Sequence, residues 1–235
     1  MRSTSSGAAF AAANAAMVRG VDSASTVHVL LADCLALLGA DTAGVLIRVG
    51  EQELELLAAT SHQALELELY QSQLHSGPCV ETIESGHVVS ASGAAEIQER
   101  WPDFGSAMSA AGLLTVHATP MRWHERVLGG VNLFWRTDRQ LTPTESELAQ
   151  AFADICTLAL MQSTAADEPT TVLERLRTAL QGRVVIERAK GALAQIDDLD
   201  MAEAFSQLVK LSDQAGRPLA EVAQAILDDI VTSPR

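Results

Sequence analysis

Apolar residues in the first part of the chain follow two different periods. Across residues 26–38 they recur every three or four positions, which predicts an amphipathic helix that ends at Gly39. Across 43–49 they alternate with other residues, and after a turn the apolar pattern resumes at 54–58. This order predicts a helix followed by a β-hairpin.

The middle of the chain continues the mixture of helices and strands. Short helices are expected at 63–74, 79–85 and 103–111, and a short strand near residues 87–90. Two longer strands, 113–121 and 126–135, are separated by a turn, and the second is apolar on both faces, as in the interior of a sheet. Thr142, Pro143 and Glu145 then match the N-cap, first and third positions of a helix that runs to about Gln162.

Beyond this point only the helical period remains. Residues 163–171 lack large apolar side chains and form the expected linker, and helix breaks fall at 197–198 and 215–218. In the first of the three C-terminal helices we expect a buried stripe of Val185, Ala189, Ala192 and Ile196, with small Gly191 allowing close helix contact. A mixed α+β region followed by an all-α region favours two domains.

The predicted organisation therefore has four parts. Residues 1–25 are an N-terminal segment with partial disorder, 26–162 an α+β domain, 163–171 the linker, and 172–231 a three-helix domain.

Charge is distributed unevenly between these parts. The chain has a net charge of −14, which argues against nucleic-acid binding over the whole surface. Residues 1–169 account for −12 of it and 170–235 for only −2, with five cations and one carboxylate between positions 175 and 190. A nucleic-acid partner would therefore have to bind this segment.

Other classes of function find little support. The three cysteines lack metal-site spacing and suit a reducing compartment, and no stretch is apolar enough for a membrane span, so we expect a cytoplasmic protein. No arrangement of carboxylates or of Ser, His and Asp indicates catalysis, so we expect no enzymatic activity.

Residues 26–162 resemble a GAF domain, a fold with a central antiparallel sheet and flanking helices. The matching stretches are Gly77-Pro78-Cys79, Arg100-Trp101-Pro102 and Leu128-Gly129-Gly130-Val131-Asn132-Leu133. The resemblance implies a sensory domain for a small-molecule ligand or a partner, but it does not identify a cofactor. We interpret His117 as a half-buried, hydrogen-bonded residue rather than a haem ligand, and Cys79 as a packing residue rather than a reactive thiol.

The C-terminal region resembles an ANTAR domain, and the whole chain resembles GAF–ANTAR antitermination regulators of actinobacterial type. The matching positions are Arg183, Ile186, Glu187, Ala189, Lys190, Gly191 and Leu193, then Ala204, Phe205 and Leu208, then Leu219, Val222, Ala223 and Ile226. The resemblance implies binding of an RNA hairpin that prevents a transcription terminator from forming. The residues expected to contact RNA are Arg183, Arg188, Lys190, Lys210 and Arg217.

The sequence departs from the family in two places. Lys210 is the sole cation in the stretch 208–213 of the second helix, and Asp197, Asp198 and Asp200 replace a loop that is often basic. Both changes should weaken the affinity for phosphates.

Two alternatives remain open for the C-terminal region. A helix-turn-helix DNA-binding regulator would use residues 219–230 for recognition, but that segment carries Glu221, Asp228 and Asp229 and no cation. A protein-interaction module regulated by the GAF domain would bind no nucleic acid. For the RNA-binding regulator we expect a homodimer in which a signal at the GAF domain changes the presentation of the basic helix, with Leu173, Leu176 and Leu180 at helical spacing supporting the pairing.

Overall fold

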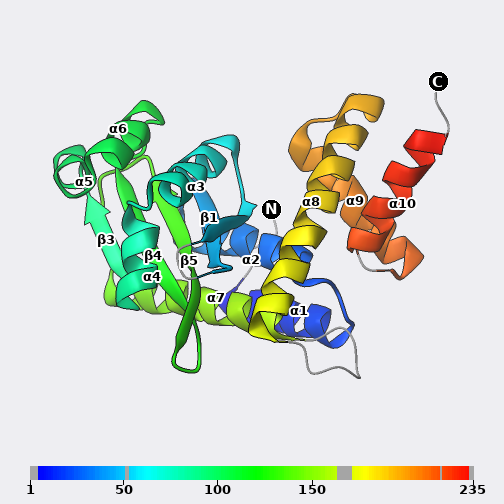
Figure 1. Ribbon diagram of the computed structural model, residues 1–235, viewed down its shortest axis with the longest axis horizontal. Coiled ribbons are helices and arrows are strands. Elements are labelled where there is room, and N and C mark those ends of the chain that lie inside the picture. The colour runs from blue at the N-terminus through cyan, green and yellow to red at the C-terminus, as the bar shows by residue number, and fades with distance from the viewer. Residues whose placement is uncertain (1–4, 51–52, 163–170, 218, 233–235) are drawn as a thin grey trace.

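A five-stranded antiparallel sheet organises the first two thirds of the chain in the computed structural model, which describes residues 5–50, 53–162, 171–217 and 219–232 (Figure 1). The strand order is β2-β1-β5-β4-β3, so β2 and β3 lie at the edges. The strands are β1 (Thr42–Arg48), β2 (Leu54–Ala59), β3 (Val89–Ser92), β4 (Thr115–Trp123) and β5 (Arg126–Trp135). The predicted hairpin of β1 with β2, and the adjacent pair β4 and β5, are confirmed.

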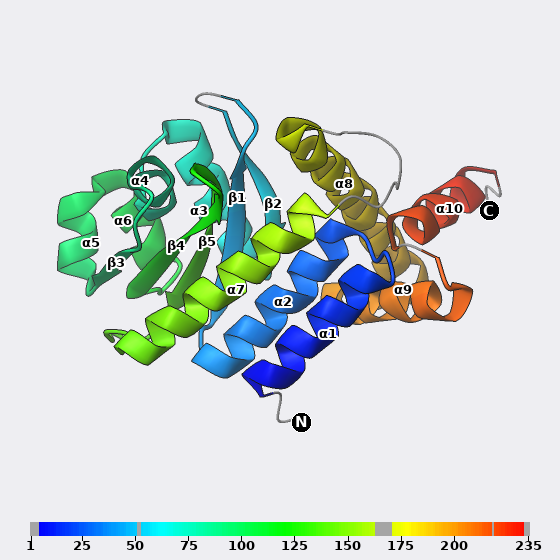
Figure 2. The ribbon, with the colours of Figure 1, turned by 90° about the horizontal axis from the view of Figure 1, so that it is seen from below.

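Helices cover both faces of this sheet. On one face lie α1 (Ser6–Val18), α2 (Ser23–Leu38) and α7 (Pro143–Met161), which run side by side in Figure 2. The other face carries α3 (His62–Leu74), α4 (Pro78–Ser85), α5 (Ala94–Arg100) and α6 (Pro102–Ala110). We refer to α1–α7 and the five strands together as the sheet domain.

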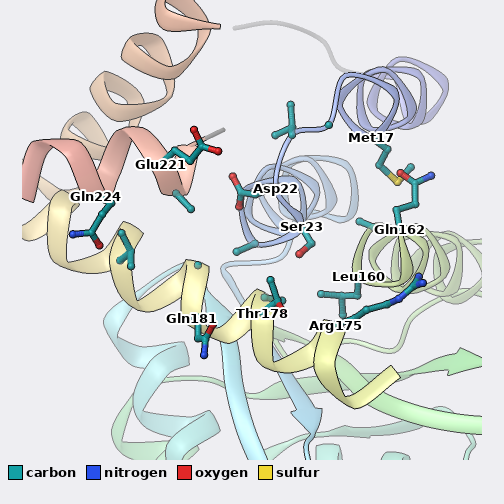
Figure 3. Close-up of a pocket in the computed structure, with 18 residues that line it drawn as sticks. Met17, Asp22, Ser23, Leu160, Gln162, Arg175, Thr178, Gln181, Glu221 and Gln224 are labelled. Carbon is teal, nitrogen blue, oxygen red and sulfur yellow. The ribbon is translucent and has the colours of Figure 1, made fainter. Parts of the chain in front are cut away.

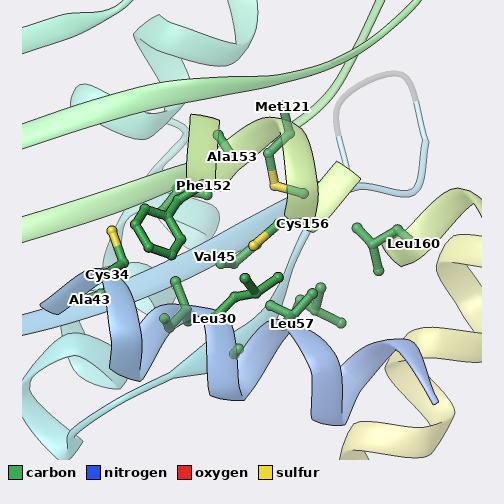
Figure 4. Close-up of a cluster of buried hydrophobic side chains, with 14 of the residues drawn as sticks. Leu30, Cys34, Ala43, Val45, Leu57, Met121, Phe152, Ala153, Cys156 and Leu160 are labelled. Carbon is green, nitrogen blue, oxygen red and sulfur yellow. The ribbon is translucent and has the colours of Figure 1, made fainter. Parts of the chain in front are cut away.

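The main core lies between the sheet and the layer formed by α1, α2 and α7. Figure 4 shows Leu30 of α2, Phe152 and Cys156 of α7 and Val45 of β1 meeting there, and all four are at most 1% exposed. The start of α7 is fixed as predicted, because Thr142 and Glu145 form a reciprocal capping box with Pro143 in the first turn. The strand β5 passes so close to β1 that a Cβ on Gly129 would lie 2.2 Å from the Leu46 carbonyl oxygen.

The N-terminal segment differs from its prediction. Residues Ser6–Val18 form α1, and Ala9 and Ala13 on this helix are buried in the main core, so this part of 1–25 is ordered. The pattern of small residues misled the prediction because alanines bury little apolar area yet allow close helix packing. The helix predicted from residue 26 begins earlier, at Ser23, with Asp22 as its N-cap.

Three helices complete the chain: α8 (Val172–Asp197), α9 (Met201–Ala215) and α10 (Leu219–Thr232). Most of the predicted linker, residues 163–170, lies outside the described residues, and Thr171 is the N-cap of α8. The breaks predicted at 197–198 and 215–218 are confirmed by the ends of α8 and α9. Asp200 precedes α9 and accepts a 2.8 Å hydrogen bond from the Glu203 backbone N–H in the first turn of that helix.

The buried stripe of α8 differs from its prediction by about one position. Ile186, Ala189 and Leu193 are buried against α9 and α10, whereas Ile196 is 44% exposed. A Cβ on Gly191 would meet nothing within 4 Å, so the expected close contact there is absent from the described structure. The prediction for Ala189 is confirmed, since this residue is fully buried.

The helix α8 belongs to two cores. Leu176, Ala179 and Leu180 in its first half are buried in the main core of the sheet domain, and the second half packs with α9 and α10. Two of the three leucines expected to support a dimer are therefore covered within the chain itself, while Leu173 is 37% exposed. Among the helices of the described ranges, none combines the length and apolar character needed to cross a bilayer.

Candidate functional site

The basic segment lies on a helix whose start is strongly fixed. Thr171 Oγ1 accepts a hydrogen bond from the Glu174 N–H at 3.2 Å, and a Glu174 carboxylate oxygen accepts the Thr171 N–H at 2.6 Å. The Thr171 N–H and the Thr171 hydroxyl, which also donates to this carboxylate at 2.9 Å, lower the pKa of Glu174. This capping box satisfies backbone N–H groups at the helix start and so fixes the residue at which α8 begins.

Arg183 does not lie free on the surface of α8. Its guanidinium donates a 2.7 Å hydrogen bond to the carbonyl oxygen of Leu56, on the edge strand β2. Burial lowers the pKa of Arg183, and the nearby charges of Glu187 and Glu55 oppose that effect. Arg183 is thus a partly desolvated cation held by the sheet domain.

Lys190 is also withdrawn from solvent. It is 8% exposed, and its Nζ lies 2.7 Å from Oε2 of Glu187, one turn earlier on α8. Its charge contributes to lowering the pKa of His28 on α2, after the larger effect of burial. Lys190 therefore lies close to the sheet domain, as Arg183 does.

The other three expected RNA-contacting residues are exposed. Arg188 and Lys210 form no ion pair within the described parts of the chain. Arg217, after α9, lies 3.4 Å from Glu221 through its Nε. In this arrangement the structure separates the five predicted residues into two covered cations and three accessible ones.

Sequence reasoning missed the residues of the sheet domain that meet the C-terminal helices. The rings of His28 on α2 and Phe205 on α9 lie 4.2 Å apart between centroids, and Ala24 is buried in the core formed by α8, α9 and α10. Ala24 and His28 are one turn apart on α2, which is the pattern of a face that packs on another helix. No feature of the sequence indicated which helix that would be.

A second candidate site is a polar cluster buried between the sheet and α3. The Asn132 amide nitrogen donates to both carboxyl oxygens of Glu68, at 2.7 and 2.8 Å, and Gln71 donates to one of them at 3.1 Å. Burial raises the pKa of Glu68 to about 8, and the hydrogen bond from Asn132 offsets part of that rise. The side chains of Glu68, Gln71 and Asn132 are all fully buried, so the cluster has no contact with solvent.

His117 and Cys79 are both inside the sheet domain. The His117 Nε2 lies 3.4 Å from the Ser146 hydroxyl, and burial lowers the pKa of this histidine to about 4. Burial raises the pKa of the Cys79 thiol well above its usual value, which is the opposite of an activated thiolate. In the described residues no group of three or more His, Cys, Asp or Glu side chains is arranged to hold a metal ion.

A recess of about 520 Å³ opens where the sheet domain meets the C-terminal helices (Figure 3). Met17 and Leu160 line it from the sheet domain, Arg175 and Thr178 from α8, and Glu221 from α10. This recess therefore lies at the junction of the two parts, and the polar cluster around Glu68 lies apart from it.

The fold and the site define a class of protein: a regulator with an α+β sensory domain and a small helical domain that carries local positive charge. The chain belongs to the GAF domain family, whose model matches residues 22–160, and it carries an ANTAR domain at residues 174–227. An ANTAR domain is the RNA-binding module of antitermination regulators, and neither matched domain is a catalytic one. Sequence comparison with curated proteins found no significant match.

Solved structures share the fold of the sheet domain. The phycoerythrobilin-bound GAF domain of a cyanobacterial phytochrome matches with a TM-score of 0.52 at 13% identity, covering 68% of this chain and 96% of that one. The GAF domain of an Acinetobacter phosphoenolpyruvate-protein phosphotransferase matches with a TM-score of 0.52 at 8% identity, covering 69% and 96%. At these identities the likeness shows the fold alone.

Proposed function

We propose that this protein is a cytoplasmic, signal-responsive antitermination regulator that binds RNA hairpins through its ANTAR domain. The observation that carries the proposal is the ANTAR match at residues 174–227, which includes all five expected RNA-contacting cations. Guanidinium and ammonium groups bind phosphates, and they also stack on or hydrogen-bond to the unpaired bases of RNA loops. In this proposal the GAF domain receives the signal, and the protein is a GAF–ANTAR regulator of actinobacterial type.

Arg188 offers the most direct test, because it is exposed and free of ion pairs within the described residues. Replacing it by glutamate should weaken binding to a two-hairpin RNA about tenfold and reduce the salt dependence of binding by about one counterion. A gel shift at two salt concentrations measures both. Lys190→Glu is less suitable, because the new carboxylate would be buried beside Glu187.

The matched control is Arg122→Glu, an exposed arginine of the GAF domain that makes the same change in net charge. It should leave the affinity unchanged, with folding of both variants checked by circular dichroism. Equal affinity of wild type and Arg188→Glu at both salt concentrations would favour the protein-interaction module instead.

Duplex DNA in a parallel gel shift distinguishes the remaining alternative. The helix α10 carries Glu221 in its first turn and no basic residue in its last turn, which is electrostatically unfavourable in a DNA groove. Tighter binding to duplex DNA than to hairpin RNA would contradict the proposal.

A further inference from the structure

We propose that the GAF domain withholds part of the RNA-binding surface by a direct contact with α8 and α9. We call this the interdomain contact, and it consists of Arg183 with Leu56 and of His28 with Phe205. The inference rests on the proposed function, since it concerns the regulation of the same RNA-binding surface.

The Arg183 half of the contact competes directly with RNA. A guanidinium donates hydrogen bonds and accepts none, so the Leu56 carbonyl oxygen occupies a donor that a phosphate oxygen or a base would otherwise use. The 2.7 Å distance indicates a well-formed, charge-assisted hydrogen bond. RNA can engage that donor only after Arg183 leaves β2.

The His28 half covers the neighbouring surface of α8. Its ring packs against Phe205, and Ala24, one turn earlier on α2, is 7% exposed within the core of the C-terminal helices. Lys190 lies near this histidine and is 8% exposed. Its ammonium group forms an ion pair with Glu187. The contact thus places His28 of the sheet domain near Lys190, a second expected RNA-contacting residue that has little exposure to solvent.

Separation of this contact need not unfold either core. Leu176 and Leu180 belong to the main core, whereas Ile186 and the residues after it belong to the core with α9 and α10. Gly182 lies between these two halves of α8, and a glycine in a helix interior lowers the resistance to bending. A bend there would withdraw Arg183 from Leu56 while the first half of α8 stays packed.

Charge reversal on the GAF side tests the proposal without altering the RNA-binding residues. Glu55 is an exposed residue of β2 whose charge acts favourably on Arg183, so Glu55→Arg should repel Arg183 and open the contact. His28→Arg, which sets a cation near Lys190, tests the second half independently. Glu99→Arg is the control for Glu55→Arg, because it makes the same charge change on exposed α5, far from α8 in Figure 1.

Two measurements on the full chain test the proposal. One reports whether the interdomain contact opens, and the other reports whether opening changes the affinity for RNA. Acetylation of Lys190, followed by mass spectrometry without RNA, should become several-fold faster in Glu55→Arg and His28→Arg but not in Glu99→Arg. Binding to the two-hairpin RNA should tighten several-fold in the same two variants. Circular dichroism confirms that each variant is folded.

Three results would overturn the proposal, and they differ in what they say of RNA binding. Unchanged Lys190 reactivity in both variants would show that the contact does not cover this residue. Faster acetylation without tighter binding, in a protein that binds RNA, would show that the contact does not control affinity. Faster acetylation with no RNA bound by any variant would remove the RNA-binding function itself, and the regulation with it.

Discussion

At the scale of single residues, Glu68 is the most unusual group in the molecule. A carboxyl that is fully buried and accepts hydrogen bonds from two amides has its pKa raised from 4.5 to about 8, chiefly by burial. The folded protein therefore retains a proton that the unfolded chain releases above pH 4.5. The stabilisation is fully present below pH 4.5 and is lost as the pH rises through about 8.

Glu68→Gln should remove this pH dependence, because a glutamine stays neutral and fills a similar volume. Between pH 5 and 8 the free energy of unfolding of wild type should fall relative to that of the variant, by up to about 1.4 kcal/mol per pH unit. Urea unfolding at pH 5, 6.5 and 8 measures the difference. Glu66→Gln, an exposed position on the same helix, is the control, and parallel curves for wild type and Glu68→Gln would contradict the prediction.

At the scale of elements, two glycines should respond oppositely to the same substitution. Gly129→Ala should destabilise the sheet by several kcal/mol, because the new methyl group would lie 2.2 Å from a β1 backbone oxygen that cannot move away. Gly191→Ala should stabilise α8 by about 0.5–1 kcal/mol, since its Cβ meets nothing within 4 Å and alanine favours the helix. Thermal unfolding of both variants provides the comparison, and equal shifts in the same direction would refute it.

The helices and strands also show which parts of the fold could be predicted from the sequence. Periodicity and capping residues predicted the hairpin β1–β2, the start of α7 at Thr142 and the end of α8 at Asp197, because each of these depends on neighbouring residues. The helix α1 was missed because its residues are mostly alanine, so that polar and apolar side chains are hardly separated between its two faces. Its burial is decided by distant partners such as Phe152, whose ring lies 4.9 Å from that of Phe10.

In the candidate site, too, local features could be predicted from the sequence, whereas contacts with distant residues could not. The residue types and their spacing predicted a cluster of cations on α8, but not that Arg183 would meet the Leu56 carbonyl, 127 positions away along the chain. The acceptor is a backbone atom, so no side chain in the sequence could have indicated it. The one-residue error in the buried stripe of α8 has a similar origin, since α9 and α10 select the face.

At the scale of the whole molecule, the covered leucines change the expectation for dimers. Leu176 and Leu180 already pack within the chain, so a homodimer formed through them would require α8 to leave the sheet domain. We therefore expect a predominantly monomeric protein at micromolar concentration without RNA, and a dimer when a two-hairpin RNA is bound. Light scattering with and without RNA measures this, and a stable dimer without RNA would contradict the expectation.

Because α8 joins the two cores, a small change in its direction produces a larger displacement at its C-terminal end. With 26 residues and a rise of about 1.5 Å per residue, this helix is about 39 Å long. Its second half, from Gly182 to Asp197, is a lever about 22 Å long, so a bend of about 20° at Gly182 would carry the far end by about 8 Å, which exceeds a helical turn of about 5.4 Å. Such a bend leaves Leu176 and Leu180 packed in the main core, yet it would move Lys190, eight residues beyond Gly182, by about 4 Å.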